Sequence, residues 1–152
     1  MLYEVSRADM WVGELEDRPG ALAERLDKLA ALGANLESIV VQRAEDKPGV
    51  AQMYVSPLRG AAARETGLSK AGGLHTVRIE GPDRPGMAAT ISRAVGDAGI
   101  NMRGFSGAAI GARHAIYITF DCMEDANQAT QILLKTLAET PAYQETPPAE
   151  GW

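Results

Sequence analysis

The tetrapeptide Asp-Arg-Pro-Gly occurs twice in this chain, at residues 17–20 and 83–86, and the two occurrences are 83 − 17 = 66 residues apart. With this shift, residues 17–35 and 83–101 align without a gap and share 7 of 19 residues. The identities beyond the tetrapeptide include a glycine and an asparagine near the end of each stretch: Gly33 and Asn35, Gly99 and Asn101. In a chain of 152 residues, such a repeat predicts two small domains of similar structure.

Each copy shows the same order of local patterns. An alternating apolar run precedes the tetrapeptide, a helical pattern follows it, and a second extended run begins at the asparagine. Aspartate can cap a helix by accepting a hydrogen bond from first-turn N–H groups, and proline is tolerated in that turn. We therefore expect helices capped by Asp17 and Asp83 that end near Gly33 and Gly99, because glycine suits a helix C-terminus.

The first copy is less complete than the second. Its apolar spacing predicts a long or broken strand, a helix, two further strands and a short second helix, at residues 2–16, 19–32, 36–43, 50–56 and 58–66. A glycine-rich loop follows, and no separate fourth strand is evident before the second copy. Two alternatives remain open: the first domain lacks this strand, or residues 2–6 supply it.

The second copy predicts a strand, a helix, a hairpin that turns near Gly111 and a second helix, at residues 74–80, 85–98, 101–109 with 113–121, and 124–137. The β-α-β-β-α order, with a closing strand, predicts the α+β class: two ferredoxin-like domains in tandem, each an antiparallel sheet with helices on one face. We expect the domains at residues 1–70 and 71–139. A mobile tail rich in proline and glutamate is expected at 140–152.

Composition narrows the possible partners. The net charge of −5 and pI near 5.0 leave no basic footprint for a nucleic acid. The single cysteine, Cys122, excludes an intramolecular disulfide and fits a reducing compartment. Residues 1–16 carry several charges and no apolar segment suited to a signal peptide or a spanning helix. We therefore expect a cytoplasmic protein that binds neither nucleic acid nor membrane.

The tetrapeptide, the helix and the Gly-x-Asn that opens the next strand together resemble the ACT domains, a family of amino-acid-sensing regulatory modules. Both copies match, over residues 10–56 and 74–137, and the tandem is similar to small bacterial two-ACT proteins described as amino-acid-binding. The resemblance implies a ligand beside the loop and the asparagine, at an interface between two domains. The residues that it implies for ligand binding are Asp17, Arg18, Pro19, Gly20, Ala21 and Asn35 in the first copy, and Asp83, Arg84, Pro85, Gly86, Met87 and Asn101 in the second.

Elementary chemistry favours the same location. A helix N-terminus offers unpaired N–H groups and a partial positive charge to a carboxylate, and Gly20 and Gly86 leave room for its approach. An asparagine amide both donates and accepts, as a zwitterion requires. The alternative is that Asp-x-Pro-Gly simply starts a helix. Arg18 and Arg84 are opposed by the helix dipole, so each either meets an anion or leans back on Glu16, Asp17 or Asp83 in solvent.

Catalysis has little support in the sequence. His75 and His114, the only histidines, are expected to be half-buried strand residues, and Cys122 has no activating neighbour. No metal-ligand spacing occurs, and the glycine-rich stretch 104–111 lacks the Gly-Lys-Ser/Thr ending of a phosphate loop. We expect no enzyme activity, no cofactor and no metal.

The expected function is therefore that of a non-catalytic regulator that binds a small amino acid or related carboxylate and thereby alters its interaction with a protein partner. Domains of this size favour a homodimer. Two alternatives are a structural or oligomerisation module without ligand, and an accessory transcriptional regulator.

Overall fold

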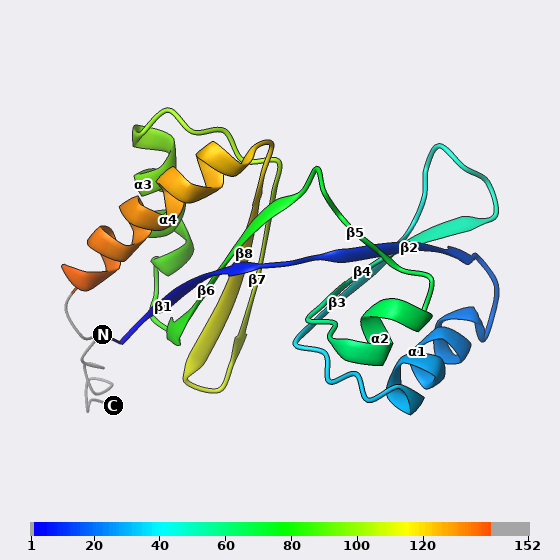
Figure 1. Cartoon of the computed structure of the whole chain (residues 1–152). Coiled ribbons are helices and arrows are strands. Elements are labelled where there is room, and N and C mark those ends of the chain that lie inside the picture. Colours follow the sequence, from blue (N-terminus) through cyan, green and yellow to red (C-terminus); the bar gives the residue numbers. More distant parts are fainter. Residues whose placement is uncertain (1, 141–152) are drawn as a thin grey trace, which may run out of the picture. The chain divides into compact units, whose positions relative to one another are not determined.

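The computed structural model describes residues 2–140, which form two compact units with one four-stranded sheet and two helices each (Figure 1). The N-terminal domain comprises residues 8–75, and the C-terminal domain combines residues 2–7 with residues 76–140. In each domain the helices cover one face of the sheet (Figure 1). The predicted α+β class with two ferredoxin-like domains is confirmed.

The N-terminal domain contains β2 (Trp11–Glu16), α1 (Ala21–Ala31), β3 (Ser38–Arg43), β4 (Val50–Ser56), α2 (Gly60–Glu65) and β5 (Ser69–Lys70). Its strands lie in the order β3-β4-β2-β5, and β4 pairs antiparallel with both β2 and β3. Alternate residues of β4 point into the core, where Met53 and Val55 pack with Leu15 and with Leu29 of α1. The helix predicted near 58–66 is confirmed as α2.

The fourth strand of the N-terminal domain comes from the glycine-rich segment where the sequence predicts a loop. This strand, β5, consists of Ser69 and Lys70 only, and Lys70 lies opposite Trp11 of β2. Residues 2–6 therefore do not complete this sheet, and the prediction of a loop at 67–73 is wrong at these two residues. Two residues are too few to produce a periodic pattern, so the sequence carried no strand signal here.

The C-terminal domain contains β6 (His75–Pro82), α3 (Met87–Asp97), β7 (Gly104–Ile110), β8 (Arg113–Phe120) and α4 (Met123–Ala138), and it also takes β1 (Glu4–Ala8) from the start of the chain. The strand order is β1-β6-β8-β7, so β1 lies beside β6 as the fourth strand. The structure differs here from the expected domains at residues 1–70 and 71–139. The boundary between the domains follows residue 75, and residues 2–7 belong to the second domain. Apart from Thr140, the predicted tail at 140–152 lies outside the described residues.

Burial explains why the N-terminal segment joins the C-terminal domain. Tyr3, just before β1, is 3% exposed and belongs to the same core as Val77 and Ile79 of β6. Within residues 2–140, α4 is the last element of the chain, so the place beside β6 is filled from the other end.

The two helices that follow the tetrapeptides begin at glycine. The N-cap residues of α1 and α3 are Gly20 and Gly86, with φ of 86° and 81°, and neither helix has a side-chain cap hydrogen bond. The predicted capping by Asp17 and Asp83 is therefore wrong, because each aspartate lies three residues before the N-cap. The predicted C-terminal glycines, in contrast, follow both helices with positive φ.

We expect Gly81→Ala to lower the free energy of unfolding of the C-terminal domain by about 1–3 kcal/mol, the usual cost of overpacking a core. A Cβ at Gly81 would clash with Cδ1 of the buried Tyr3. Urea unfolding of the full chain measures the change. The control is Gly96→Ala in α3, where a Cβ meets nothing within 4 Å. In a Tyr3→Ala background the cost of Gly81→Ala should largely vanish, and an equal cost in both backgrounds would contradict the assigned contact.

Candidate functional site

A cavity of about 320 Å³ lies at the start of α3 in the C-terminal domain. It is bounded by the loop before α3, the first turn of α3, and strands β7 and β8. Its volume suits a small ligand. Of the six residues predicted for the second copy, four line this cavity: Asp83, Arg84, Gly86 and Met87. Pro85 and Asn101 are not among its lining residues, and Asn101 is exposed.

Gly86 shapes the start of the cavity through its backbone conformation. Its φ of 81° is in the left-handed region that favours glycine, whereas a Cβ at this position would meet nothing within 4 Å. The glycine is therefore needed for the turn rather than to clear an approach. The first-turn N–H of Met87 donates to the Arg84 carbonyl (3.3 Å), so the N–H groups that follow it are the ones a helix N-terminus offers to an anion.

Two side chains on the lining of this cavity have buried polar atoms without a hydrogen-bond partner among the described residues. They are Nε of Arg84 and Nε2 of His114. A buried polar atom left unpaired costs about 1–3 kcal/mol, so such atoms are few in folded proteins. Their presence on one cavity lining is typical of a binding site.

The sequence did not identify His114 as a site residue. It is 5% exposed, and its Nδ1 lies 3.1 Å from the Pro82 carbonyl oxygen. The alternation of β8 carried the missing signal, because Ile116 and Ile118 point into the core and the same period places His114 on their face. The prediction that His114 is half-buried is wrong, since it is buried, whereas His75 in β6 is half-buried as predicted.

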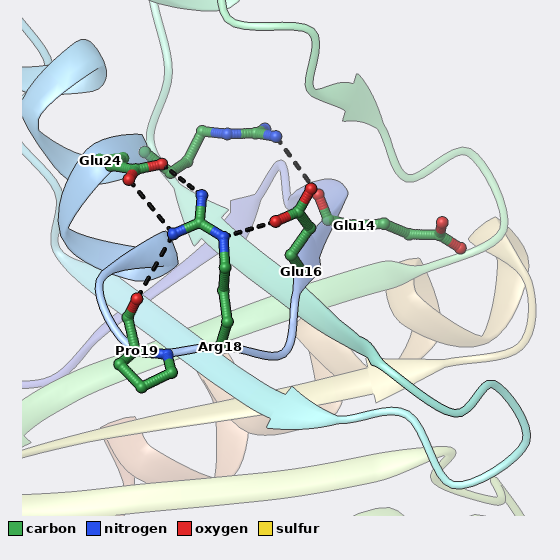
Figure 2. A network of polar contacts seen from close by, with 6 residues as sticks. Glu14, Glu16, Arg18, Pro19 and Glu24 are labelled. Atoms are coloured by element: carbon green, nitrogen blue, oxygen red, sulfur yellow. Dashed lines mark hydrogen bonds and ion pairs between the residues drawn. The ribbon is translucent and has the colours of Figure 1, made fainter.

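The first copy also has a cavity, of about 330 Å³, which is lined mostly by charged side chains, and several of these bind one another (Figure 2). Two predicted residues line it, Arg18 and Ala21. The guanidinium of Arg18 binds both oxygens of Glu24 at 2.7 and 3.2 Å and donates through Nε to Glu16 at 2.5 Å. The hydrogen bonds to Glu24 and then to Glu16 raise the pKa of Arg18, and the same contact lowers the pKa of Glu24.

Arg18 therefore leans back on neighbouring acids, which confirms one of the two predicted alternatives for this residue. Asp17 instead accepts a hydrogen bond from Nε of Arg43 at 2.6 Å. The other predicted residues of the first copy do not line its cavity, and Asn35 is exposed. The four predicted residues outside this lining are Asp17, Pro19, Gly20 and Asn35.

The repeat explains why the two arginines differ. The shift of 66 residues aligns Glu16 with Pro82 (82 − 16 = 66) and Glu24 with Thr90 (90 − 24 = 66). Both acidic partners of Arg18 are thus replaced by uncharged residues around Arg84. The first copy satisfies its arginine internally, and the second copy leaves Nε of its arginine unpaired.

Other candidate chemistry finds little support in the described part of the chain. Cys122 is exposed, and its sulfur accepts a hydrogen bond from the Asp125 N–H at the start of α4. Residues 2–140 contain no group of three or more His, Cys, Asp or Glu side chains arranged to hold a metal ion. No helix within this range is both long and apolar enough to cross a membrane.

Comparison with known proteins gives a family match for the C-terminal domain and a fold for both domains. Residues 75–136 match the ACT domain family model. No curated protein matches the chain significantly. Among solved structures, protein BT0572 from Bacteroides thetaiotaomicron is 16% identical with a TM-score of 0.71, and the match covers 88% of this chain and 90% of that one. The ligand-free regulatory subunit of aspartate kinase from Thermus thermophilus is 19% identical with a TM-score of 0.61, and the match covers 88% of this chain and 95% of that one.

The corresponding regulatory subunit from Thermus flavus is 17% identical with a TM-score of 0.58, and the match covers 90% of this chain and 97% of that one. At these identities the similarity concerns the fold. It extends over both copies of the repeat, because each alignment covers most of the chain.

Proposed function

We propose that this chain, which has an ACT domain at residues 75–136 and a second domain of ACT-like fold, is a non-catalytic sensor of a small amino acid. The ligand binds in the cavity at the start of α3. The observation that carries this proposal is the unpaired, buried Nε of Arg84 on the lining of a 320 Å³ cavity beside a helix N-terminus. A ligand carboxylate satisfies both the guanidinium and the helix N–H groups.

The first copy has a different role in this proposal. Arg18 is held by Glu16 and Glu24, so a carboxylate would have to displace two acids before reaching it. We therefore assign ligand binding to the second copy and a structural role to the first. The residues assigned to the ligand are Asp83, Arg84, Gly86 and Met87.

The proposed assembly is a homodimer formed through β7. This edge strand is exposed along its whole length, and Phe105 and Gly107 on it also line the cavity. An exposed apolar edge strand readily pairs with another chain. A second copy at this edge would cover the cavity, so that ligand binding and assembly support each other.

The regulated step in this proposal is an interaction with another protein. The Thermus proteins that share the tandem fold are regulatory subunits of an enzyme, aspartate kinase. By analogy, the occupied and empty forms of this protein would differ in affinity for a partner. An exposed free cysteine suits a reducing compartment, so we place this interaction in the cytoplasm.

Thermal unfolding against each of the twenty amino acids tests ligand binding. At 100 times its dissociation constant, a ligand should stabilise the protein by about 2.7 kcal/mol. Arg84→Gln should abolish this shift, because it removes the charge and the guanidinium fork while the shorter side chain stays polar. Arg18→Gln is the matched control at the equivalent position of the repeat, and it should leave the ligand-induced shift unchanged. If Arg18→Gln abolishes the shift and Arg84→Gln does not, the ligand binds in the first copy and the proposed assignment to the second copy is wrong.

A structural or oligomerisation module is the second candidate function. The edge strands favour it, because Ile39 and Val40 on β3 and Ile110 on β7 are exposed apolar side chains. In that case no amino acid would change the unfolding temperature, whereas the protein would still dimerise in sedimentation experiments.

A further inference from the structure

We propose that His114 makes the cavity at the start of α3 selective for amino acids over simple carboxylic acids, by accepting a hydrogen bond from the ligand ammonium at Nε2. This inference rests on the proposed function, since it concerns the same cavity. It assigns the second half of ligand recognition to a residue in β8, outside the repeated tetrapeptide and outside the helix start.

The hydrogen bond at the other ring nitrogen fixes the role of Nε2. A carbonyl oxygen can only accept, so the 3.1 Å contact with Pro82 requires that Nδ1 of His114 carries the hydrogen. In the neutral ring, Nε2 then has a lone pair and accepts. His114 lines the cavity, and its buried Nε2 has no partner within residues 2–140. A ligand that satisfies it must bring a hydrogen-bond donor.

The cavity lining offers groups suited to both charges of a zwitterion. Its charged or titratable lining side chains are Asp83, Arg84 and His114. Arg84 and the α3 N-terminus attract a carboxylate, whereas Asp83 and Nε2 of His114 suit an ammonium. The rest of the lining is small or apolar, with Gly107 and Ile116 among it, so recognition depends on these few polar groups.

Two contacts with residues outside the cavity lining, Tyr3 and Pro82, hold His114 in place. The ring of Tyr3 lies 5.9 Å from the imidazole, centroid to centroid, and the Pro82 carbonyl fixes the ring orientation through Nδ1. Tyr3 is itself buried against Gly81, the residue before Pro82. The acceptor is thus preorganised, which lowers the entropy cost of binding.

Paired ligands and paired variants test the role of His114. The probes are each amino acid that stabilises the wild type and the acid that lacks its amino group, such as propionate for alanine or succinate for aspartate. Calorimetric titration of the full chain measures both affinities. His114→Asn places an amide near Nδ1 and keeps a donor for Pro82, but it has no atom near Nε2. His114→Gln places an amide oxygen near Nε2 and should restore the acceptor.

In the wild type, the amino acid should bind about tenfold or more tightly than its deaminated counterpart, the usual effect of one hydrogen bond to a charged group. His114→Asn should reduce this ratio about tenfold and leave the affinity for the deaminated acid within about twofold, and His114→Gln should recover much of the ratio. His114→Phe, which keeps a ring against Tyr3, should behave like His114→Asn and serves if that variant fails to fold. An unchanged ratio in the folded variants overturns the role of His114 alone, whereas a wild type that binds no amino acid overturns the proposed function as well.

Discussion

Tyr3→Ala should lower the free energy of unfolding of the C-terminal domain by about 3–5 kcal/mol, the usual cost of truncating a buried aromatic side chain. Tyr3 is 3% exposed and packs with Val77 and Ile79, although most of that core comes from residues beyond 76. The substitution leaves a cavity between the N-terminal segment and β6. Hydrogen exchange followed by mass spectrometry measures the effect. The substitution should speed exchange in β6 and β8 and change exchange little in β2 and β4.

The matched control is Leu2→Ala, one residue away. Leu2 is 53% exposed, so its truncation should change stability by no more than about 0.5 kcal/mol. Equal effects of the two substitutions, or a loss of protection confined to the N-terminal domain, would contradict the placement of Tyr3 in the C-terminal core.

Met53→Ala should lower the free energy of unfolding of the N-terminal domain by about 2–5 kcal/mol. Met53 lies in the central strand β4, is 0% exposed, and packs with Leu15 and Val55 in a core separate from that of Tyr3. Hydrogen exchange should show faster exchange in β2 and β4. Because the proposed ligand site is in the other domain, amino-acid binding should persist at temperatures where the Met53→Ala protein is still folded.

Leu22→Ala provides the control for Met53→Ala. Leu22 lies on α1, where alanine is favourable, and it is 38% exposed, so the change in stability should be well below that of Met53→Ala. A loss of ligand binding in the folded Met53→Ala protein would argue against a site confined to the second copy.

Most elements of the fold could be predicted from local sequence patterns, whereas the pairing between strands far apart in the sequence could not. Apolar spacing predicted α1, α3, α4 and the β7–β8 hairpin, because each depends on residues close in sequence. The alternation in residues 2–16 indicates extended backbone but contains nothing about which sheet accepts it. For this reason the two strands β1 and β2 were expected as one, whereas they lie in different sheets.

The lining of the candidate cavity was predictable in part for the same reason. Asp83, Arg84, Gly86 and Met87 are contiguous with the repeated tetrapeptide, so a local motif located them. His114 reaches the cavity from another strand, through a pairing that only the fold reveals. The difference between Arg18 and Arg84 was visible in the aligned repeats, since Glu16 and Glu24 have no acidic counterparts in the second copy.

Because β1 completes the sheet of the C-terminal domain, the N-terminal domain is an insertion within it, between the first strand and the second. During synthesis, residues 8–75 emerge as a complete folding unit. In contrast, β1 leaves the ribosome before its partner β6 and stays unpaired until β6 has been made, some 70 residues later. A fragment that begins at residue 76 would lack both β1 and Tyr3. Work on the proposed amino-acid site therefore requires the intact chain, since a fragment defined by the family match alone would expose an unpaired edge of β6 and remove the contact between Tyr3 and His114.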